Sequence, residues 1–458
     1  MRPIGAYIVW TVLASAAVAI VFANRRRAAA WQPLALAGVV AGSVTAFALV
    51  SWGRATPLGD FNKAYYPAGL LITGDPSQLY ACEAGNLCFV NLPLVALFFR
   101  PLSVLGLWPA QIIFTVAGAI AVAAAAWLTV RDLDAAGARR YAIVAVFALN
   151  GPLLYSARLG NLTHVLLPLL VIAFMSLTRG RDVQAGVLLA VLTVIKLPFL
   201  LYLPYLAVRG RRLAAAAFAV SLALMVIVSV ALFGADLHAT WLRGFVEPFA
   251  TRPVGAYNVQ SVTALLAHLM MPGNLTNWMP LDASPLFTAL QYAILLGLTA
   301  TAGFALILSG PPRRPAAQRA ELHLVLTLTL LVSPLTWTHY YAFLAVPLAS
   351  YAAGRVHAPG RVWRLVVAAA AVLVSLPVVL PVARHPLLGA VIERILISHY
   401  TWGGILLLGA LCASRVAVEG RAFLSPRRLF LSLSAPGEIA HRDTVAITSA
   451  DTSGVGRP

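Results

Sequence analysis

Long apolar runs make up most of the chain, and short clusters of arginine separate one run from the next. Several runs continue for roughly 18 residues without a charged side chain, and about 20 apolar residues in a helix cross the hydrocarbon core of a bilayer. The pattern therefore predicts membrane-spanning helices near residues 4–23, 33–52, 110–130, 140–157, 161–178, 213–234, 286–308, 321–335, 338–353, 362–383 and 400–416.

The composition excludes a soluble protein. Of the 458 residues, 60% are hydrophobic and 10% are charged, whereas a soluble globular domain carries about 25% charged residues. A helix satisfies all of its backbone hydrogen bonds within one apolar segment, as a bilayer requires. We therefore expect an all-α, polytopic membrane protein with about 11–13 transmembrane helices.

Arginine clusters dominate the charge of the chain, which has 33 basic and 15 acidic residues and a formal net charge of +18. The clusters lie between apolar runs, as basic residues do in the cytoplasmic loops of membrane proteins. No basic groove with interleaved aromatic residues is visible, so the charge indicates contact with the headgroups of a lipid bilayer and not with nucleic acid. We expect a multi-pass protein of the plasma membrane.

Two long loops fall on the outer side of this topology, at about residues 53–109 and 235–285. They carry nearly half of the acidic residues, so chemistry that needs a carboxylate is expected on the extracytoplasmic face. Within the first loop, residues 92–107 predict a juxtamembrane or re-entrant helix. The transmembrane domain then covers residues 1–416, and the polar residues 417–458 predict a disordered cytoplasmic tail.

The apolar stretch 183–207 has arginine on both sides, so a single crossing would place one arginine cluster outside. A hairpin broken at Lys196-Leu197-Pro198 keeps both clusters inside, because proline interrupts a helix. Each leg would measure about 18 Å, which is too short to cross a bilayer alone. We therefore expect Lys196 at the tip of a hairpin that packs within the protein.

Signals for disulfides, metals and nucleotides are sparse. Cys82 and Cys88 share the first outer loop, where an oxidising compartment would permit a disulfide, and two free thiols are the alternative. No Cys and His residues have the spacing of a zinc site, and no Walker or Rossmann glycine pattern occurs. We expect no metal site and no cofactor, and an ATP-driven pump is disfavoured.

Five short motifs follow one another along the predicted topology. They are GDFNKAYYPAGLLITGDPSQLY at 59–80 with PLVALFFRPLSVLGLWPAQIIF at 93–114, Gly160-Asn161, Lys196-Leu197-Pro198, Asn258-Val259-Gln260-Ser261, and SPLTWTHY at 333–340. In this order they resemble family 87 of the GT-C glycosyltransferases, over roughly residues 33–355. That family includes bacterial mannosyltransferases of phosphatidylinositol mannosides and arabinofuranosyltransferases of cell-wall arabinan.

Three features depart from the family pattern. Asn91-Leu92-Pro93 stands where Tyr-Pro-Pro is usual, Gly160-Asn161 replaces Gly-Gln, and an additional N-terminal span precedes the first outer loop. These departures affect the identity of the sugar and the acceptor more than the type of reaction.

Asp60 is the candidate catalytic residue. A lone Asp after a glycine most often caps a helix N-terminus, which is the structural alternative. The resemblance instead implies that Asp60 is the catalytic base. The chemistry requires such a group, because a sugar hydroxyl is a poor nucleophile until a nearby carboxylate takes its proton.

The resemblance and the charge pattern place the donor phosphate at Lys196, His339 and Arg158. An ammonium inside the membrane is costly unless it meets an anion, although Lys196 could cap carbonyl groups of the broken helix. Arg158 lies on the outer side, where it could bind a phosphate in bidentate fashion or extend to headgroups. His339 lies among aromatic residues that an interfacial belt explains equally well.

The same resemblance suggests six residues that contact the substrates. They are Tyr66, Asn161, Asn258, Gln260, Trp337 and Tyr340. Asn and Gln in a long loop usually stabilise turns, which is the structural alternative for Asn258 and Gln260.

The sequence therefore predicts an inverting hexosyl- or pentosyltransferase of the GT-C type. Its donor would be a polyprenyl-phosphate sugar, carrying mannose or arabinofuranose, and its acceptor a membrane glycolipid or a cell-wall glycan. The active site would face the extracytoplasmic side, where nucleotide sugars are not supplied. A transporter or flippase of a lipid-linked sugar is the main alternative, since transporters also use broken helices. A non-catalytic assembly protein is the third.

Overall fold

The computed structural model of the chain describes residues 57–81, 88–271, 273–378 and 386–419. The predicted spans 4–23 and 33–52 lie outside these residues, as does the tail beyond residue 419. Cys82 also lies outside them, so its disulfide with Cys88 stays a prediction.

The described residues form helices throughout, apart from one isolated bridge between Val259 and Trp337. The elements are η1 Phe61–Tyr65, α3 Tyr66–Leu71, η2 Pro76–Tyr80, α4 Pro93–Ser103, α5 Leu107–Asp132, α6 Ala138–Ala148, α7 Gly151–Leu159, α8 Thr163–Thr178, α9 Asp182–Ile195, η3 Leu197–Leu201, α10 Tyr202–Val208, α11 Arg212–Phe233, α12 Ala235–Trp241, η4 Leu242–Val246, α13 Glu247–Thr251, α14 Val262–Met270, α15 Pro285–Ser309, α16 Pro315–Val332, η5 Thr338–Leu344, α17 Ala345–Ala352, α18 Gly360–Ser375, α19 Pro386–Arg394, η6 Leu396–Ser398 and α20 His399–Glu419. The predicted all-α class is confirmed.

Four described helices are long and apolar enough to cross a membrane: α5, α11, α15 and Gly389–Val418, which includes all of α20 except Glu419. The bent pair α6 and α7 raises this number to five when it is counted as one span. In α5, α11 and α15 most of the apolar window is not buried by the rest of the protein. Such helices require lipid around them, and the protein is therefore a multi-pass membrane protein.

Two predicted spans are broken in the structure. The range 140–157 is divided between α6 and α7, which meet at an angle of 46°. Asn150 caps α7 by accepting a hydrogen bond from the Leu153 amide at 2.9 Å, and Pro152 lacks the amide proton that would continue α6. The range 338–353 begins as the 3₁₀ helix η5 and becomes α-helical only at Ala345.

The predicted hairpin at residues 183–207 is present. Helix α9 ends at Lys196, whose backbone is extended with φ −136° and ψ 90°, and η3 and α10 return the chain. The two ends of the hairpin lie together, because Arg211 forms a salt bridge of 2.9 Å with Asp182. Arg211 also donates a hydrogen bond to the carbonyl of Leu177 at the end of α8.

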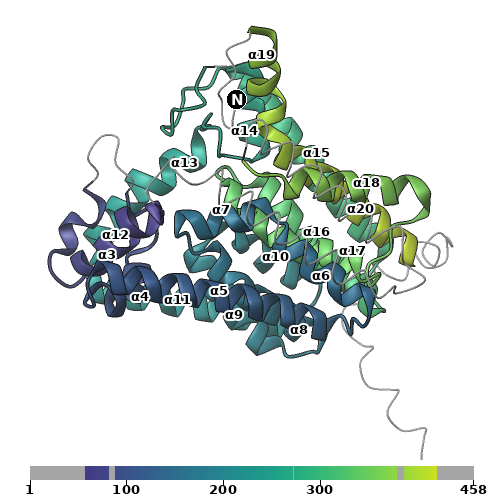
Figure 1. Cartoon of the computed structure of the whole chain (residues 1–458), viewed down its shortest axis with the longest axis horizontal. Helices are drawn as coiled ribbons and strands as arrows, with labels where there is room; N and C mark the ends of the chain where they lie inside the picture. The colour runs from purple at the N-terminus through teal and green to yellow at the C-terminus, as the bar shows by residue number, and fades with distance from the viewer. Residues whose placement is uncertain (1–56, 82–87, 272, 379–385, 420–458) are drawn as a thin grey trace, which may run out of the picture.

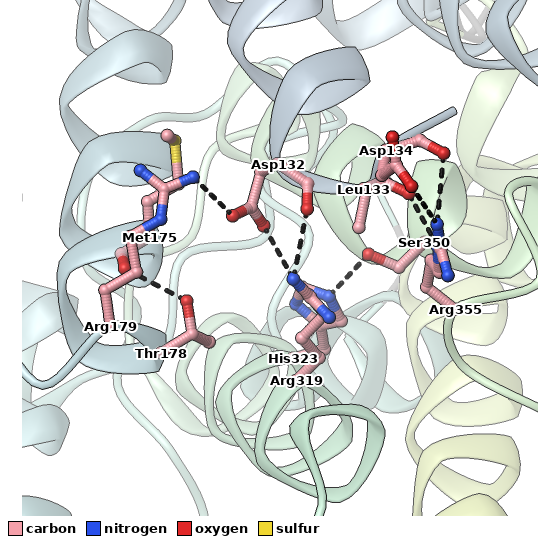
Figure 2. Close-up of polar contacts among 10 residues, drawn as sticks. All are labelled: Asp132, Leu133, Asp134, Met175, Thr178, Arg179, Arg319, His323, Ser350 and Arg355. Carbon is pink, nitrogen blue, oxygen red and sulfur yellow. Dashed lines mark hydrogen bonds and ion pairs between the residues drawn. The ribbon is translucent and has the colours of Figure 1, made fainter. Parts of the chain in front are cut away.

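Arginines from several of the described clusters lie together at one end of the helical bundle. Figure 2 shows Asp132 between Arg179 and Arg319, at 3.4 Å and 3.3 Å, and Arg355 beside Asp134 at 3.3 Å. These contacts join the ends of α5, α8, α16 and α17. The segments predicted to share one side of the membrane thus meet at one end.

A buried ionic cluster ties further helices together at that end. Glu321 accepts hydrogen bonds from Arg209 at 2.6 Å and from Arg415 at 2.8 Å, and Glu321 and Arg415 are wholly buried. Arg415 also donates to the carbonyl of Gly310 at 2.6 Å. Because an isolated charge is costly in such an environment, these partners hold α10, α16 and α20 in one arrangement.

The two predicted outer loops pack on each other away from the arginine clusters. In Figure 1, α3 and α12 lie at the left, whereas α6 and α17 lie at the right. Trp241 of the second loop donates to the carbonyl of Val90 at 3.0 Å, and the rings of Tyr80 and Phe245 lie 5.4 Å apart. The first loop thus has a fixed place over the bundle.

Candidate active site

Asp60 begins the segment that carries the candidate base. It precedes η1, a π-helical turn, and its side chain makes no capping hydrogen bond to that turn. Instead, its Oδ2 atom accepts a hydrogen bond from Nδ2 of Asn161 at 2.8 Å. The described contacts of Asp60 therefore do not include the helix cap that was its structural alternative.

Gly160 allows the Asp60 segment to approach the start of α8. Its φ of 68° is left-handed, and a Cβ atom at this position would lie 2.7 Å from Cβ of Phe61. The amide of Leu58 donates to the carbonyl of Arg158 at 2.8 Å, which fixes the same contact from the other side. The Gly160-Asn161 motif thus places Asn161 directly against Asp60.

Lys196 reaches the same point from the tip of the hairpin. Its Nζ atom donates to Oδ1 of Asn161 at 3.2 Å and lies 4.3 Å from the centroid of the Tyr340 ring. Lys196 is buried, with 4% of its surface exposed. The ammonium is therefore held by one amide oxygen and one aromatic face, neither of which carries a negative charge.

His339 lies next to this ammonium and has no hydrogen-bond partner. It is buried, and both Nδ1 and Nε2 lack a partner in the described part of the chain. Its ring centroid lies 5.0 Å from that of Tyr340. Buried polar atoms are usually hydrogen-bonded, so this imidazole beside a buried lysine lacks a polar partner that the described residues do not supply.

An apolar cavity of about 350 Å³ borders Tyr340. Its walls come from the hairpin tip, the second outer loop, the residues just before α4 and the segment 329–340. They are Val90, Asn91, Leu92, Val194, Ile195, Leu197, Pro198, Leu201, Trp241, Phe245, Val246, Phe249, Ala250, Thr329, Val332, Ser333, Pro334, Leu335, Trp337 and Tyr340. The volume lies within the range of small-molecule sites.

The environment of Asp60 changes its acidity. Burial raises the pKa of its carboxyl above the ordinary value, and the hydrogen bond from Asn161 and the charge of Lys196 oppose that rise. The carboxyl is thus a stronger base, when ionised, than an exposed aspartate. No group of three or more His, Cys, Asp or Glu side chains that could bind a metal occurs among the described residues.

The structure brings five of the predicted site residues together: Asp60, Asn161, Lys196, His339 and Tyr340. Trp337 lines the cavity beside them. The backbone carbonyl of Tyr66 accepts a hydrogen bond from Ser103 at 2.7 Å, and the Tyr66 ring lies 6.1 Å from that of Phe61.

Asn258 and Gln260 make contacts within the protein. The carbonyl of Asn258 accepts from the Thr338 amide at 2.8 Å. Gln260 donates its side-chain amide to the carbonyl of Ile397 at 2.7 Å. Through these contacts and the Val259–Trp337 bridge, the second outer loop supports the segment that carries His339.

Arg158 lies on α7, two residues before Gly160, and is half-buried. Among the described residues its guanidinium forms no salt bridge with a carboxylate. Its charge acts on Tyr155, which also lies within electrostatic reach of Asp60. Arg158 therefore lies near the Asp60 site.

Tyr65 is a site residue that the sequence did not reveal. It is buried, and its hydroxyl accepts a hydrogen bond from Nδ2 of Asn161 at 3.3 Å. Tyr65 follows Asp60 by one turn of the π-helix η1, whereas an α-helix would bring other positions to that face. The only signal for Tyr65 in the sequence was its place beside Tyr66, and the predicted substrate contact was Tyr66.

The helices and the site define a multi-pass membrane protein with a polar centre at the end of the bundle away from its arginine clusters. The model of "Glycosyltransferase family 87" matches residues 89–334, which is more than half of the chain, and the chain belongs to this family. The predicted resemblance is thereby confirmed, and the protein is a glycosyltransferase. The match includes Asn161 and Lys196 and excludes Asp60 and His339.

One solved structure is similar to the chain, the apo crystal structure of ArnT from Cupriavidus metallidurans. The sequence identity is 17%, the TM-score is 0.35, and the similarity covers 84% of this chain and 78% of that one. At this TM-score the similarity carries no argument about function. No curated protein matches the chain.

Proposed function

We propose that the protein transfers mannose or arabinofuranose from a polyprenyl-phosphate donor to a membrane glycolipid or a cell-wall glycan, with inversion at the anomeric carbon. The observation that carries this proposal is the placement of Asp60 and Lys196 on the two sides of Asn161, beside an apolar cavity. One carboxylate and one ammonium are the two charged groups that such a displacement needs.

Asp60 acts as the general base. The acceptor hydroxyl attacks the anomeric carbon and gives its proton to the carboxylate as the new glycosidic bond forms. One oxygen of Asp60 already accepts from Asn161, and Oδ1 has no hydrogen-bond partner among the described residues. That oxygen is available to the acceptor.

Lys196 and His339 bind the phosphate that leaves with the lipid. A buried ammonium without a carboxylate partner is stabilised when an anion arrives, and the leaving phosphate is such an anion. His339 supplies two further ring nitrogens that lack partners in the described residues. Arg158, on the Asp60 side, is an additional phosphate ligand in this proposal.

The cavity beside Tyr340 supports a lipid-linked donor. Its lining is mainly apolar and includes Tyr340, and the centroid of the Tyr340 ring lies 4.3 Å from the Lys196 ammonium. A polyprenyl chain that enters this cavity brings its phosphate to Lys196. Hydrophobic contact of this kind would contribute nothing to the binding of a nucleotide sugar.

The distribution of arginine supports the extracytoplasmic location of the active site. Arginine clusters mark the cytoplasmic end of a membrane protein, and the Asp60 site lies at the other end of α8. The 16 residues of α8 separate the two ends by about 24 Å. The active site then faces the compartment that lipid-linked sugars reach and nucleotide sugars do not.

Reconstituted protein tests the donor class. We expect it to transfer radiolabelled sugar from polyprenyl-phosphate mannose or polyprenyl-phosphate arabinofuranose to lipid extracted from the source membrane, and not from the corresponding nucleotide sugars. Transfer from a nucleotide sugar, or protein-dependent movement of the lipid-linked sugar across the vesicle without transfer, would contradict the proposal.

A further inference from the structure

Asn161 occupies the centre of the site and is almost completely buried, with 4% of its surface exposed. Its Nδ2 atom donates to Oδ2 of Asp60 at 2.8 Å and to the hydroxyl of Tyr65 at 3.3 Å. Its Oδ1 atom accepts from the amide and the hydroxyl of Thr163, at 3.1 Å and 3.0 Å, and from Lys196 at 3.2 Å.

These contacts use the whole hydrogen-bonding capacity of the side chain. A primary amide has two N–H donors and two lone pairs on its oxygen. Both donors of Asn161 have partners, and its oxygen accepts three bonds. No donor or lone pair is left for a sugar hydroxyl, although the sequence suggested that Asn161 contacts the substrate.

The amide also separates two groups of opposite charge. Asp60 and Lys196 both approach Asn161, yet they form no salt bridge with each other. A direct pair would occupy the carboxylate and the ammonium at once, and a paired carboxylate is a weaker base. With Asn161 between them, Lys196 keeps N–H groups for a phosphate, and Asp60 keeps one oxygen for the acceptor.

We propose that Asn161 is a positioning residue, which fixes the base Asp60 and the phosphate-binding Lys196 at a set separation and does not itself bind the sugar. This inference rests on the proposed function, because it takes the roles of Asp60 and Lys196 from it. In place of the predicted substrate contact, Asn161 then has the role of keeping Asp60 and Lys196 at a fixed distance from each other.

A purely structural role for Asn161 makes a different prediction for one substitution. The bonds from Thr163 to Oδ1 form a turn at the start of α8, and aspartate makes this turn as well as asparagine does. Asn161→Asp also keeps an oxygen for Lys196. It removes only the donors to Asp60 and Tyr65, and it places a second carboxylate beside the base.

Transfer kinetics distinguish the two roles. We expect Asn161→Asp to fold, to bind product lipid and to lower the transfer rate by about 100-fold, because small displacements of catalytic groups have effects of this size. The acid limb of its pH–rate profile moves to higher pH, since two adjacent carboxylates share a proton. The other groups that face Asp60, namely Lys196, Tyr65, Tyr155 and Tyr340, are unchanged in this variant.

Asn150→Asp is the matched control. Asn150 is also buried, and its oxygen caps the N-terminus of α7. Aspartate keeps this cap, so the control carries a similar cost of burying a carboxyl without changing a contact of Asp60. This control should keep the wild-type transfer rate and pH profile. An Asn161→Asp variant that also keeps both would overturn the positioning role.

A double variant tests the placement of the carboxylate. Asp60→Asn with Asn161→Asp restores the hydrogen bond and the number of charges, so it should recover the thermal stability of the wild type. It should not recover transfer, because the carboxylate is then at position 161. Recovery of transfer would show that the position of the base is not fixed, and the inference would be wrong.

One readout needs no substrate. An apolar carbodiimide modifies protonated carboxyl groups, and peptide mass spectrometry reports the modification of Asp60 as a function of pH. The midpoint should rise in Asn161→Asp and stay constant in Asn150→Asp. If reconstituted wild-type protein transfers sugar from no lipid-linked donor, the proposed function is wrong. If the midpoint of Asp60 modification is the same in Asn161→Asp and in wild type, the contact between Asn161 and Asp60 is wrong.

Discussion

At the scale of single residues, the main feature of the site is a pair of opposite charges in apolar surroundings. The site holds a carboxylate and an ammonium within a mostly apolar membrane protein, and it leaves each with unused capacity. The uncharged partners of Lys196, the Asn161 oxygen and the Tyr340 ring, stabilise the ammonium without neutralising it. In the proposed function, an arriving phosphate supplies the negative charge that these two direct partners lack.

Lys196→Ala should weaken the binding of polyprenyl phosphate, with or without its sugar, because the buried ammonium contributes most to an anion in an apolar site. Inhibition by the product lipid measures this directly, and we expect an inhibition constant raised by about 10- to 100-fold, with little change in the KM of the acceptor. Lys196→Arg should rescue only partly, since a planar guanidinium needs a different pocket. Lys63, the other lysine, is exposed, and Lys63→Ala is the control. Equal inhibition constants in Lys196→Ala and wild type would move the phosphate site elsewhere.

The acidity of Asp60 should appear in the pH dependence of transfer. The base must be ionised, and burial raises the pKa of its carboxyl above the ordinary value of an aspartate. The kcat/KM should therefore fall as the pH drops through a value above the ordinary aspartate range. An acid limb at or below the ordinary aspartate range would contradict the burial of this group.

The same pKa shift has a consequence for stability. A carboxyl with a raised pKa in the folded state opposes folding once it ionises, so stability decreases as the pH rises from the unfolded pKa to the folded pKa. In the proposed function, the carboxylate of Asp60 is thus retained at a cost to the stability of the fold.

At the scale of elements, tight packing at one glycine positions Asp60, the proposed base. Gly160→Ala should lower both thermal stability and transfer, because its Cβ atom would meet Phe61 directly after Asp60. Gly180 has a similar φ of 72° and nothing within 4 Å of its added Cβ, so Gly180→Ala is the matched control. Each substitution should cost about 1 kcal/mol of backbone strain, and only Gly160→Ala should lose transfer. Equal transfer in the two variants would separate the position of Asp60 from this contact.

The elements also show what the sequence could predict. Apolar length and arginine placement predicted the long helices and the hairpin at Lys196, because both follow from hydrophobicity and from Pro198. The helix break at Asn150 was not predicted, because this capping residue lies in the middle of a continuous apolar run. The contact of Tyr65 with Asn161 depends on a π-helical turn, which no residue pattern in this segment indicated.

At the scale of the whole molecule, the two ends of the bundle differ in how their polar groups are paired. The arginine end is closed by ion pairs. At the Asp60 end, near the cavity, the described residues leave both ring nitrogens of His339 without a partner. The order of Asp60, Asn161, Lys196 and His339 along the chain gave no distances between them. Their proximity depends on three separate contacts: the glycine turn, the hairpin, and the pairing of residues 258–260 with 336–338.

Glu321→Gln should destabilise the whole bundle. It removes the negative charge that Arg209 and the fully buried Arg415 share, and an unpaired buried charge costs about 3–5 kcal/mol. Asp134→Asn removes an exposed pair with Arg355 and should cost less than about 1 kcal/mol. Thermal unfolding in detergent compares the two, and equal midpoints would show that the Glu321 cluster does not hold the helices together.

The central claim is that Asp60 is the base of a transfer from a lipid-linked sugar, and the transfer rate of Asp60→Asn tests it most directly. The control is Asp75→Asn in the same loop, because Asp75 caps η2 through the Ser77 amide at 3.2 Å and asparagine caps equally well. At matched folded protein, Asp60→Asn should lower transfer from polyprenyl-phosphate sugar by about 10²–10⁴-fold, while Asp75→Asn keeps the wild-type rate. A wild-type rate in Asp60→Asn would contradict the account.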